Sequence, residues 1–171
     1  GDIAAWAAYK GFDVTLQDRE QRFIDPAMAR AQALFEKKVK DPARRPEVAA
    51  RLKPDLAGDG VASADLVIEA VFENREIKAD VTKRAEAQLV EGAVFGSNTS
   101  TLPITGLAEA SVRPEDFIGI HFFSPVDKMM LVEIILGEKT GPAAIAKVIA
   151  FLTGPDAAPI SGARVPVYGD A

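Results

Sequence analysis

The stretch DLVIEAVFENREIKADVTKRAEAQLVEGAVFGS, residues 65–97, decides the fold of this chain. It begins with a short apolar run at 65–71, of the kind that is buried on both faces of a parallel sheet. A helix is expected over 74–90, and residues 93–97 form a second strand-like run. The apolar side chains of this helix recur at intervals of four and are Ile77, Val81, Ala85 and Leu89. A strand, a helix and a strand in succession predict a βαβ unit with a right-handed crossover.

Upstream of this unit, helix and strand patterns already alternate. Residues 2–10 predict a helix, and residues 12–18 alternate apolar and polar side chains up to Asp18, as a strand does. A further helix over 26–40 is expected to begin with Pro26 at its first position. The apolar stripe of that helix comprises Met28, Ala31, Leu34 and Phe35.

The remainder of the chain continues the alternation. We expect a short helix at 46–52, a helix near 103–110 and a strand at 117–122, followed by an apolar run at 130–136. This order predicts an α/β fold with a doubly wound, Rossmann-like and mostly parallel sheet. A length of 171 residues suits one domain, and we expect residues 1–171 to form it.

The composition argues against several classes of protein. The net charge of −5 disfavours nucleic-acid binding, and the basic run over 37–45 is more typical of a solvated helix end than of a polyanion site. No window is apolar enough for a membrane span and no signal peptide is visible, so we expect a cytoplasmic protein. The absence of cysteine excludes disulfides and thiolate chemistry, and no metal site is expected.

Asp18 stands at the end of a predicted strand, where dinucleotide-binding folds carry an acid that accepts hydrogen bonds from the adenosine ribose. The glycine-rich loop of such folds lies at the start of the first helix, so this chain would begin inside that helix. An acid at a strand end is as typical of a plain surface position. Both interpretations stay open on this observation alone.

Four segments stand out together. They are GDIAAWAAYKGFDVTLQD (1–18), DLVIEAVFENREIK (65–78), SNTSTLPI (97–104) and GIHFFSPVDKMMLVEII (119–135). In this order they resemble the NAD-binding domain of the L-3-hydroxyacyl-CoA dehydrogenase family. The wording HFFSPVDKM is closer to the multifunctional fatty-acid β-oxidation subunits than to the free-standing enzymes, which usually have Asn at the position of Ser124.

The resemblance implies a catalytic set and a set of contacts to NAD. His121 is implied as the catalytic base, Glu133 as its carboxylate partner, and Ser100 as a hydroxyl near the nicotinamide and the reacting oxygen. The implied cofactor-binding residues are Asp18, Ala70, Val71, Glu73, Lys78, Ser100 and Ser124. Asn98 and Thr99 lead into Ser100 and receive no role of their own.

These residue types suit the oxidation of a secondary alcohol, which needs a base for the hydroxyl proton. Histidine exchanges a proton most readily near neutral pH, and the chain contains one. A carboxylate such as Glu133 on the other ring nitrogen would fix the tautomer, and in the apolar run LVEIIL it would otherwise be unfavourable. Taken singly, His121 suits a core position, Glu133 an exposed edge strand and Ser100 a helix cap. Their joint occurrence favours the site.

The resemblance also implies parts that this sequence lacks. They are the first strand with its glycine loop and the C-terminal helical domain. The tail over 152–171 matches poorly until RVPVYGDA, which resembles the last strand of the nucleotide domain. We therefore expect a chain truncated at both ends, which by itself binds NAD weakly and is weakly active or inactive.

The leading hypothesis is NAD-dependent oxidation of L-3-hydroxyacyl-CoA to 3-oxoacyl-CoA in fatty-acid β-oxidation. A second is a non-catalytic remnant that binds nucleotide or CoA or serves a structural role. A third is a related dehydrogenase for another β-hydroxy acid, such as 3-hydroxybutyryl-CoA. The resemblance further implies a parent protein that is dimeric or belongs to a β-oxidation complex with a thiolase subunit.

Overall fold

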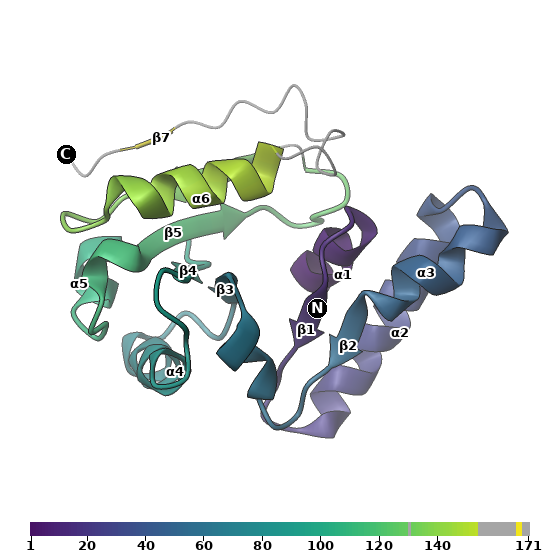
Figure 1. The fold of residues 1–171 in the computed structure, drawn as a ribbon, viewed down its shortest axis with the longest axis horizontal. Helices are drawn as coiled ribbons and strands as arrows, with labels where there is room; N and C mark the ends of the chain where they lie inside the picture. Colours follow the sequence, from purple (N-terminus) through teal and green to yellow (C-terminus); the bar gives the residue numbers. More distant parts are fainter. Residues whose placement is uncertain (130, 154–166, 169–171) are drawn as a thin grey trace. The chain divides into compact units, whose positions relative to one another are not determined.

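The computed structural model describes residues 1–129, 131–153 and 167–168, which form two compact units (Figure 1). The first unit comprises Gly1–Gly60 together with 124–129, and the second comprises Val61–Phe123 together with 131–153 and 167–168. Each unit has its own core and is described by itself. The expectation of a single domain over 1–171 stays a prediction.

The first unit packs three helices around a pair of parallel strands. Its elements are α1 (Asp2–Tyr9), β1 (Val14–Leu16), α2 (Gln21–Lys38), the 3-10 turn Pro42–Arg44, α3 (Arg45–Ala50) and β2 (Leu52–Pro54). Val14 of β1 lies opposite Leu52 of β2. The buried side chains that join the helices to this pair include Ala5, Ala8, Ala31, Phe35 and Val48.

One expectation for this unit was wrong, and one strand was not predicted. Helix α2 begins at Gln21 rather than at Pro26, because Ile24 is fully buried and starts the stripe that faces the core. The buried residues of α2 are Ile24, Ala27, Ala31 and Phe35. Pro26 is tolerated inside the helix near its start, where it removes one hydrogen bond. Strand β2 was not expected, since three residues carry no periodic pattern and are ordered only by pairing with β1.

The second unit is built on a five-stranded sheet with the strand order β3-β4-β5-β6-β7. Its strands are β3 (Leu66–Glu69), β4 (Val94–Ser97), β5 (Phe117–Phe122), β6 (Val132–Ile135) and β7 (Val167–Tyr168). Its helices are α4 (Arg75–Glu86), α5 (Ile104–Ala108) and α6 (Pro142–Thr153), with 3-10 turns at Asp59–Ser63, which begins in the first unit, and Pro114–Asp116. Only the pair β5–β6 is antiparallel among the described strand pairs, so the mostly parallel α/β fold is confirmed.

Helices cover both faces of this sheet, as a doubly wound fold requires (Figure 1). Phe95 and Phe117 pack against α4 and α5, whereas their neighbours Val94 and Ile118 pack against α6. Because side chains alternate along a strand, Glu69, Ser97, His121 and Glu133 all belong to the α4–α5 face. The sheet therefore gathers its polar side chains on one face.

Helix α4 ends at Glu86 rather than at residue 90 as expected, and the structure adds one helix. The buried residues of α4 are Lys78, Thr82, Ala85 and Glu86, whereas Ile77 is 43% exposed. A charged side chain can replace an apolar one on the buried face because Lys78 is paired with Glu69. Helix α6 was not predicted. Val167–Tyr168 form a strand that pairs with β6, and the resemblance of this segment to the last strand of the nucleotide domain stays a prediction, while 154–166 and 169–171 lie outside the described residues. No helix within the described ranges is long and apolar enough to span a membrane.

Candidate active site

The only histidine of the chain is paired with a glutamate across the antiparallel strands. His121 of β5 lies directly opposite Glu133 of β6, and Nδ1 of His121 is 2.8 Å from Oε2 of Glu133. Both side chains are partly buried, and the ring of Phe123 lies 4.4 Å from the imidazole, measured between centroids. With Nδ1 engaged by the carboxylate, Nε2 is the nitrogen that can take up a proton.

Ser100 lies in an exposed turn after β4 that is held by Glu73. Oε1 of Glu73 accepts hydrogen bonds from the backbone N–H of Ser100 at 2.9 Å and of Thr101 at 3.0 Å. The hydroxyls of Thr99 and Thr101 donate to the same oxygen. Although burial raises the pKa of Glu73, these hydrogen bonds lower it from 4.5 to about 2. Glu73 is therefore ionised and orders the turn that presents Ser100.

The helix-cap alternative for Ser100 is not observed. Helix α5 begins after Pro103, and it is the Thr99 hydroxyl that accepts from the backbone N–H of Leu102 at 3.0 Å. Ser100 is left exposed beside this turn. The Ser100 hydroxyl is therefore not committed to capping.

A buried ion pair lies beside the same turn. Nζ of Lys78 is 2.9 Å from Oε1 of Glu69, and both side chains are 2% exposed. Lys78 also donates to the backbone carbonyl of Asn98 at 3.0 Å and lies 3.6 Å from Oε2 of Glu73. The Ser97 hydroxyl donates to Glu69 as well. A charge pair this deep is favourable only when hydrogen bonds surround it, as they do here.

The other expected cofactor contacts in the second unit lie at the end of β3. Ala70 and Val71 are exposed immediately after this strand, and the backbone N–H of Val71 donates to Oε2 of Glu69 at 3.2 Å. In an open parallel sheet, ligands bind beyond the carboxyl ends of the strands. The position of Ala70, Val71, Glu73 and Lys78 is compatible with such a role, which stays a prediction.

Asp18 and Ser124 belong to the first unit. Asp18 follows β1 and lines a cavity of about 290 Å³ together with Gly1, Leu16, Arg22 and Ile24. Ser124 opens the segment 124–129, which is tied to α2 by an ion pair of 3.3 Å between Lys38 and Asp127. A Cβ built on Gly1 would lie 2.8 Å from Cβ of Ala27, so glycine permits the close packing of α1 on α2. A carboxylate beside a cavity is compatible with a contact to the ribose of a dinucleotide, and this role of Asp18 stays a prediction.

Sequence reasoning missed Glu69 and Asn98. Glu69 is a carboxylate in the apolar run DLVIEAV, which is the same signal that singled out Glu133 in LVEIIL. Asn98 gave no signal, because its contacts depend on strands that are distant in sequence. His121 with Glu133, and Ser100 with Glu73, are brought together by the structure as direct contacts.

Comparisons with known proteins identify one family that matches most of the chain. The family model described as "3-hydroxyacyl-CoA dehydrogenase, NAD binding domain" matches residues 1–164. The alpha subunit of the fatty acid oxidation complex of Psychrobacter cryohalolentis is 42% identical over 157 residues, which cover 90% of this chain and 22% of that protein. The chain thus spans about a fifth of the length of the curated relative that it matches.

Solved structures agree with the sequence comparison. The (S)-3-hydroxybutyryl-CoA dehydrogenase of Ralstonia eutropha has a TM-score of 0.84 at 30% identity, over 100% of this chain and 61% of that one. The 3-hydroxybutyryl-CoA dehydrogenase of Escherichia coli has a TM-score of 0.86 at 28% identity, over 98% of this chain and 35% of that one. The similarity covers both units of the chain.

Proposed function

The chain belongs to the family of 3-hydroxyacyl-CoA dehydrogenase NAD-binding domains, and on this premise we propose that it supplies the cofactor-binding and catalytic residues of such an enzyme. The reaction is the oxidation of an L-3-hydroxyacyl-CoA to a 3-oxoacyl-CoA in fatty-acid β-oxidation. The observation that carries the proposal is the contact between His121 and Glu133 at the end of β5.

His121 is the proposed base. Its Nδ1–H donates to Glu133, so Nε2 carries the free lone pair that accepts the proton of the substrate's 3-hydroxyl. The imidazolium that forms is stabilised by the Glu133 carboxylate at 2.8 Å. When NAD is bound, its nicotinamide would accept the hydride from C3 of the substrate, the carbon that carries this hydroxyl.

Ser100 is the proposed donor to the reacting oxygen. Its exposed position and the fixed backbone of its turn let the hydroxyl meet a substrate with little loss of conformational freedom. Asp18 is the proposed acceptor for the ribose hydroxyls of NAD, since it is a carboxylate that lines a cavity next to the start of α1. Ala70, Val71, Glu73, Lys78 and Ser124 are proposed to complete the cofactor site.

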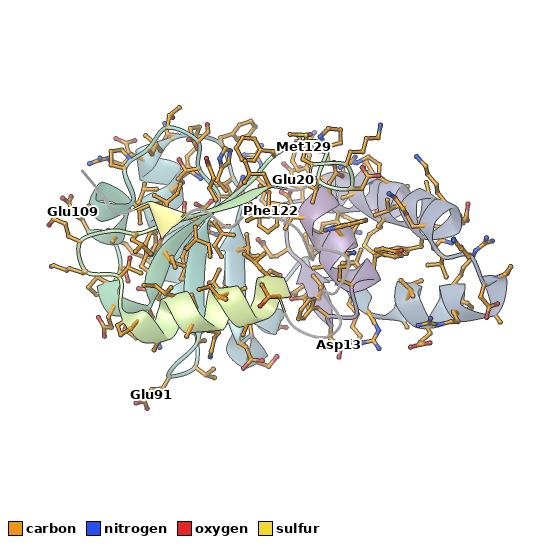
Figure 2. All side chains as sticks on the ribbon, turned by 90° about the horizontal axis from the view of Figure 1, so that it is seen from above. Asp13, Glu20, Glu91, Glu109, Phe122 and Met129 are labelled. Atoms are coloured by element: carbon orange, nitrogen blue, oxygen red, sulfur yellow. The ribbon has the colours of Figure 1, made fainter. Side chains whose placement is uncertain are left out.

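The activity is tested by following NADH absorbance as the complete protein reduces acetoacetyl-CoA. We expect His121→Gln to lower the rate by about 10²–10⁴-fold, the usual contribution of a general acid or base. A control variant is Glu109→Gln, which changes an exposed carboxylate after α5 (Figure 2). If the native protein did not reduce acetoacetyl-CoA, this result would support the hypothesis that the chain is a non-catalytic remnant.

The larger assembly is also a proposal. The relatives are named as alpha subunits of a fatty acid oxidation complex, which supports a parent protein that is dimeric or bound to a thiolase subunit. The absence of cysteine from the sequence supports a reducing location such as the cytoplasm. Co-purification of the complete protein with a second subunit that has thiolase activity tests the assembly.

A further inference from the structure

Asn98 lies where strand β4 stops pairing with β5. The last paired residues are Ser97 and Gly119. Strand β5 nevertheless continues for three more residues to Phe122, which is labelled in Figure 2. On its other side this extension is still paired with β6, through His121 opposite Glu133 and Phe122 opposite Val132. The end of β5 that holds the proposed base therefore has backbone pairing on one side only.

On the side of β5 that has no paired strand, the side chain of Asn98 provides a hydrogen-bond acceptor for the β5 backbone. Its Oδ1 accepts a hydrogen bond from the backbone N–H of Phe122 at 2.9 Å. The donor is a backbone amide, so chemistry assigns the oxygen rather than the nitrogen of the carboxamide to this contact. One side chain thus extends the support of β5 to the residue that follows His121.

The backbone of Asn98 is fixed by two further elements. Its N–H donates to the Glu69 carbonyl of β3 at 2.8 Å, and its carbonyl accepts from Nζ of Lys78 of α4 at 3.0 Å. Lys78 is itself held by the buried Glu69 carboxylate at 2.9 Å. Asn98 consequently joins β3, α4 and β5 through three separate polar groups.

The connection matters because of the residues on either side. Ser100 lies two positions after Asn98, in the turn that Glu73 orders, and His121 lies one position before Phe122. The hydrogen bond from Phe122 to Asn98 is therefore a short bridge between the Ser100 turn and the His121 strand. Displacing one reacting group by about 1 Å can reduce a rate by about 10²-fold.

We propose that Asn98 is a positioning residue, which acts through Oδ1 and the backbone of Phe122 to hold His121 in place relative to Ser100. This inference rests on the proposed function for its effect on turnover. It assigns Asn98 no contact with substrate or cofactor.

Four variants separate this role from the alternatives. Asn98→Ala removes the acceptor, and Asn98→Asp keeps an oxygen at the position of Oδ1 while it removes the Nδ2 donor. Thr140→Val is a matched control at the opposite end of β5, where the Thr140 hydroxyl donates to the Phe117 carbonyl at 2.8 Å and accepts from Gly137 at 2.9 Å. Asn98→Ser serves as a second truncation if the alanine variant does not fold.

The first measurement is nuclear magnetic resonance of the imidazole nitrogens in the 171-residue chain labelled at histidine. The chain has one histidine, so both nitrogen signals belong to His121 and need only be assigned to Nδ1 and Nε2. We expect Asn98→Ala or Asn98→Ser to shift or broaden the His121 nitrogen signals, and Asn98→Asp and Thr140→Val to leave them close to native. Native signals in both truncated variants would overturn the proposal.

The second measurement is the reduction of acetoacetyl-CoA in the complete protein. Truncation of Asn98 should lower kcat by about 10²-fold while KM changes little. The Asn98→Asp variant should retain most of the native kcat. Equal loss in Asn98→Asp and Asn98→Ala would overturn positioning in favour of a direct Nδ2 contact. If the native protein shows no reduction, the proposed function fails, and the imidazole signals still decide the role of Asn98.

Discussion

His121 and Glu133 are direct cross-strand partners, and the 2.8 Å contact between Nδ1 and Oε2 follows from their register in the β5–β6 pair. Opposite side chains on one face of an antiparallel pair lie close enough to interact, so the sheet itself sets the geometry of the imidazole. Twelve residues separate the two positions in the chain. A strand pair is a more rigid support for a proton-transferring side chain than a loop would be.

Replacing Glu133 by Gln should lower turnover more than substrate affinity. The carboxylate stabilises the imidazolium, which exists only as the proton is transferred, so its charge acts mainly on the transition state. We expect kcat to fall by about 10²-fold with little change in KM for acetoacetyl-CoA. Steady-state kinetics with NADH provide the measurement. A glutamine variant with native turnover would make Glu133 a structural carboxylate.

Replacing Ser100 by Ala should change both kcat and KM. A hydroxyl that donates to the substrate oxygen contributes before and during the reaction, unlike the Glu133 charge. We expect kcat/KM to fall by roughly 10–100-fold, with part of the loss in KM, as for one hydrogen bond to a charged or developing oxygen. Thr101→Ser is the matched control, since it keeps the hydroxyl that donates to Glu73. A loss confined to kcat would contradict this assignment.

The strands of the second unit could be predicted because each is a short apolar run between polar turns. The run 117–122 was expected with the bounds that β5 has, and His121 lies near the end of this run. The contact between His121 and Glu133 was implied by family resemblance, and the structure supplies its physical cause in the strand register. The register depends on which strands pair. The sequence of either strand alone therefore does not predict that residue 121 lies opposite residue 133.

The differences from expectation in α4 and α6 have two separate causes. The apolar spacing in α4 includes Ile77, which is 43% exposed, whereas the structure buries Lys78 beside Glu69. Hydrophobic periodicity treats every charge as exposed and so fails where two charges are buried together. Helix α6 was missed because PAAIAKVIAFLT is apolar on nearly every side and shows no polar face.

Replacing Asp18 by Ala should weaken NADH binding in the complete protein. A carboxylate that accepts hydrogen bonds from ribose hydroxyls contributes about 1.5–3 kcal/mol, which corresponds to roughly 10–100-fold in Kd. Titration calorimetry measures this directly. Asp13→Ala is the matched control, because Asp13 lies at the other end of β1 and is 88% exposed (Figure 2). Equal affinities of both variants would make Asp18 a plain surface acid.

Replacing Glu73 by Gln should lower the free energy of unfolding at neutral pH, and this loss should be smaller in acid. The pKa of Glu73 is lowered from 4.5 to about 2, so its stabilisation is complete above the unfolded value and is lost as pH falls towards 2. We expect a loss of roughly 1 kcal/mol at neutral pH, since the side chain is partly exposed. Urea unfolding of both chains across a pH series is the measurement.

Glu91→Gln is the control for that series, as Glu91 is exposed in the turn before β4 (Figure 2). The difference between the native chain and this variant should not follow the pH dependence that Glu73→Gln shows. A Glu73→Gln effect that grows as the solution becomes more acidic would have the wrong sign and would contradict the hydrogen-bonded turn.

The ion pair of Lys78 with Glu69 should behave as one unit in a double-mutant cycle. Lys78→Met leaves a carboxylate that is 2% exposed without its cation, and removing one partner of a buried pair costs about 3–5 kcal/mol. Glu69→Gln removes the charge and retains an oxygen that can accept from Ser97 and from the backbone of Val71. In the double variant neither charge of this pair remains. The loss in its free energy of unfolding should therefore be smaller than the sum of the losses in the two single variants. We expect a coupling energy of about 1–3 kcal/mol, measured by urea unfolding of the four chains. Additivity within about 0.5 kcal/mol would mean that the surrounding hydrogen bonds, rather than the attraction of the two charges, hold this part of the sheet together.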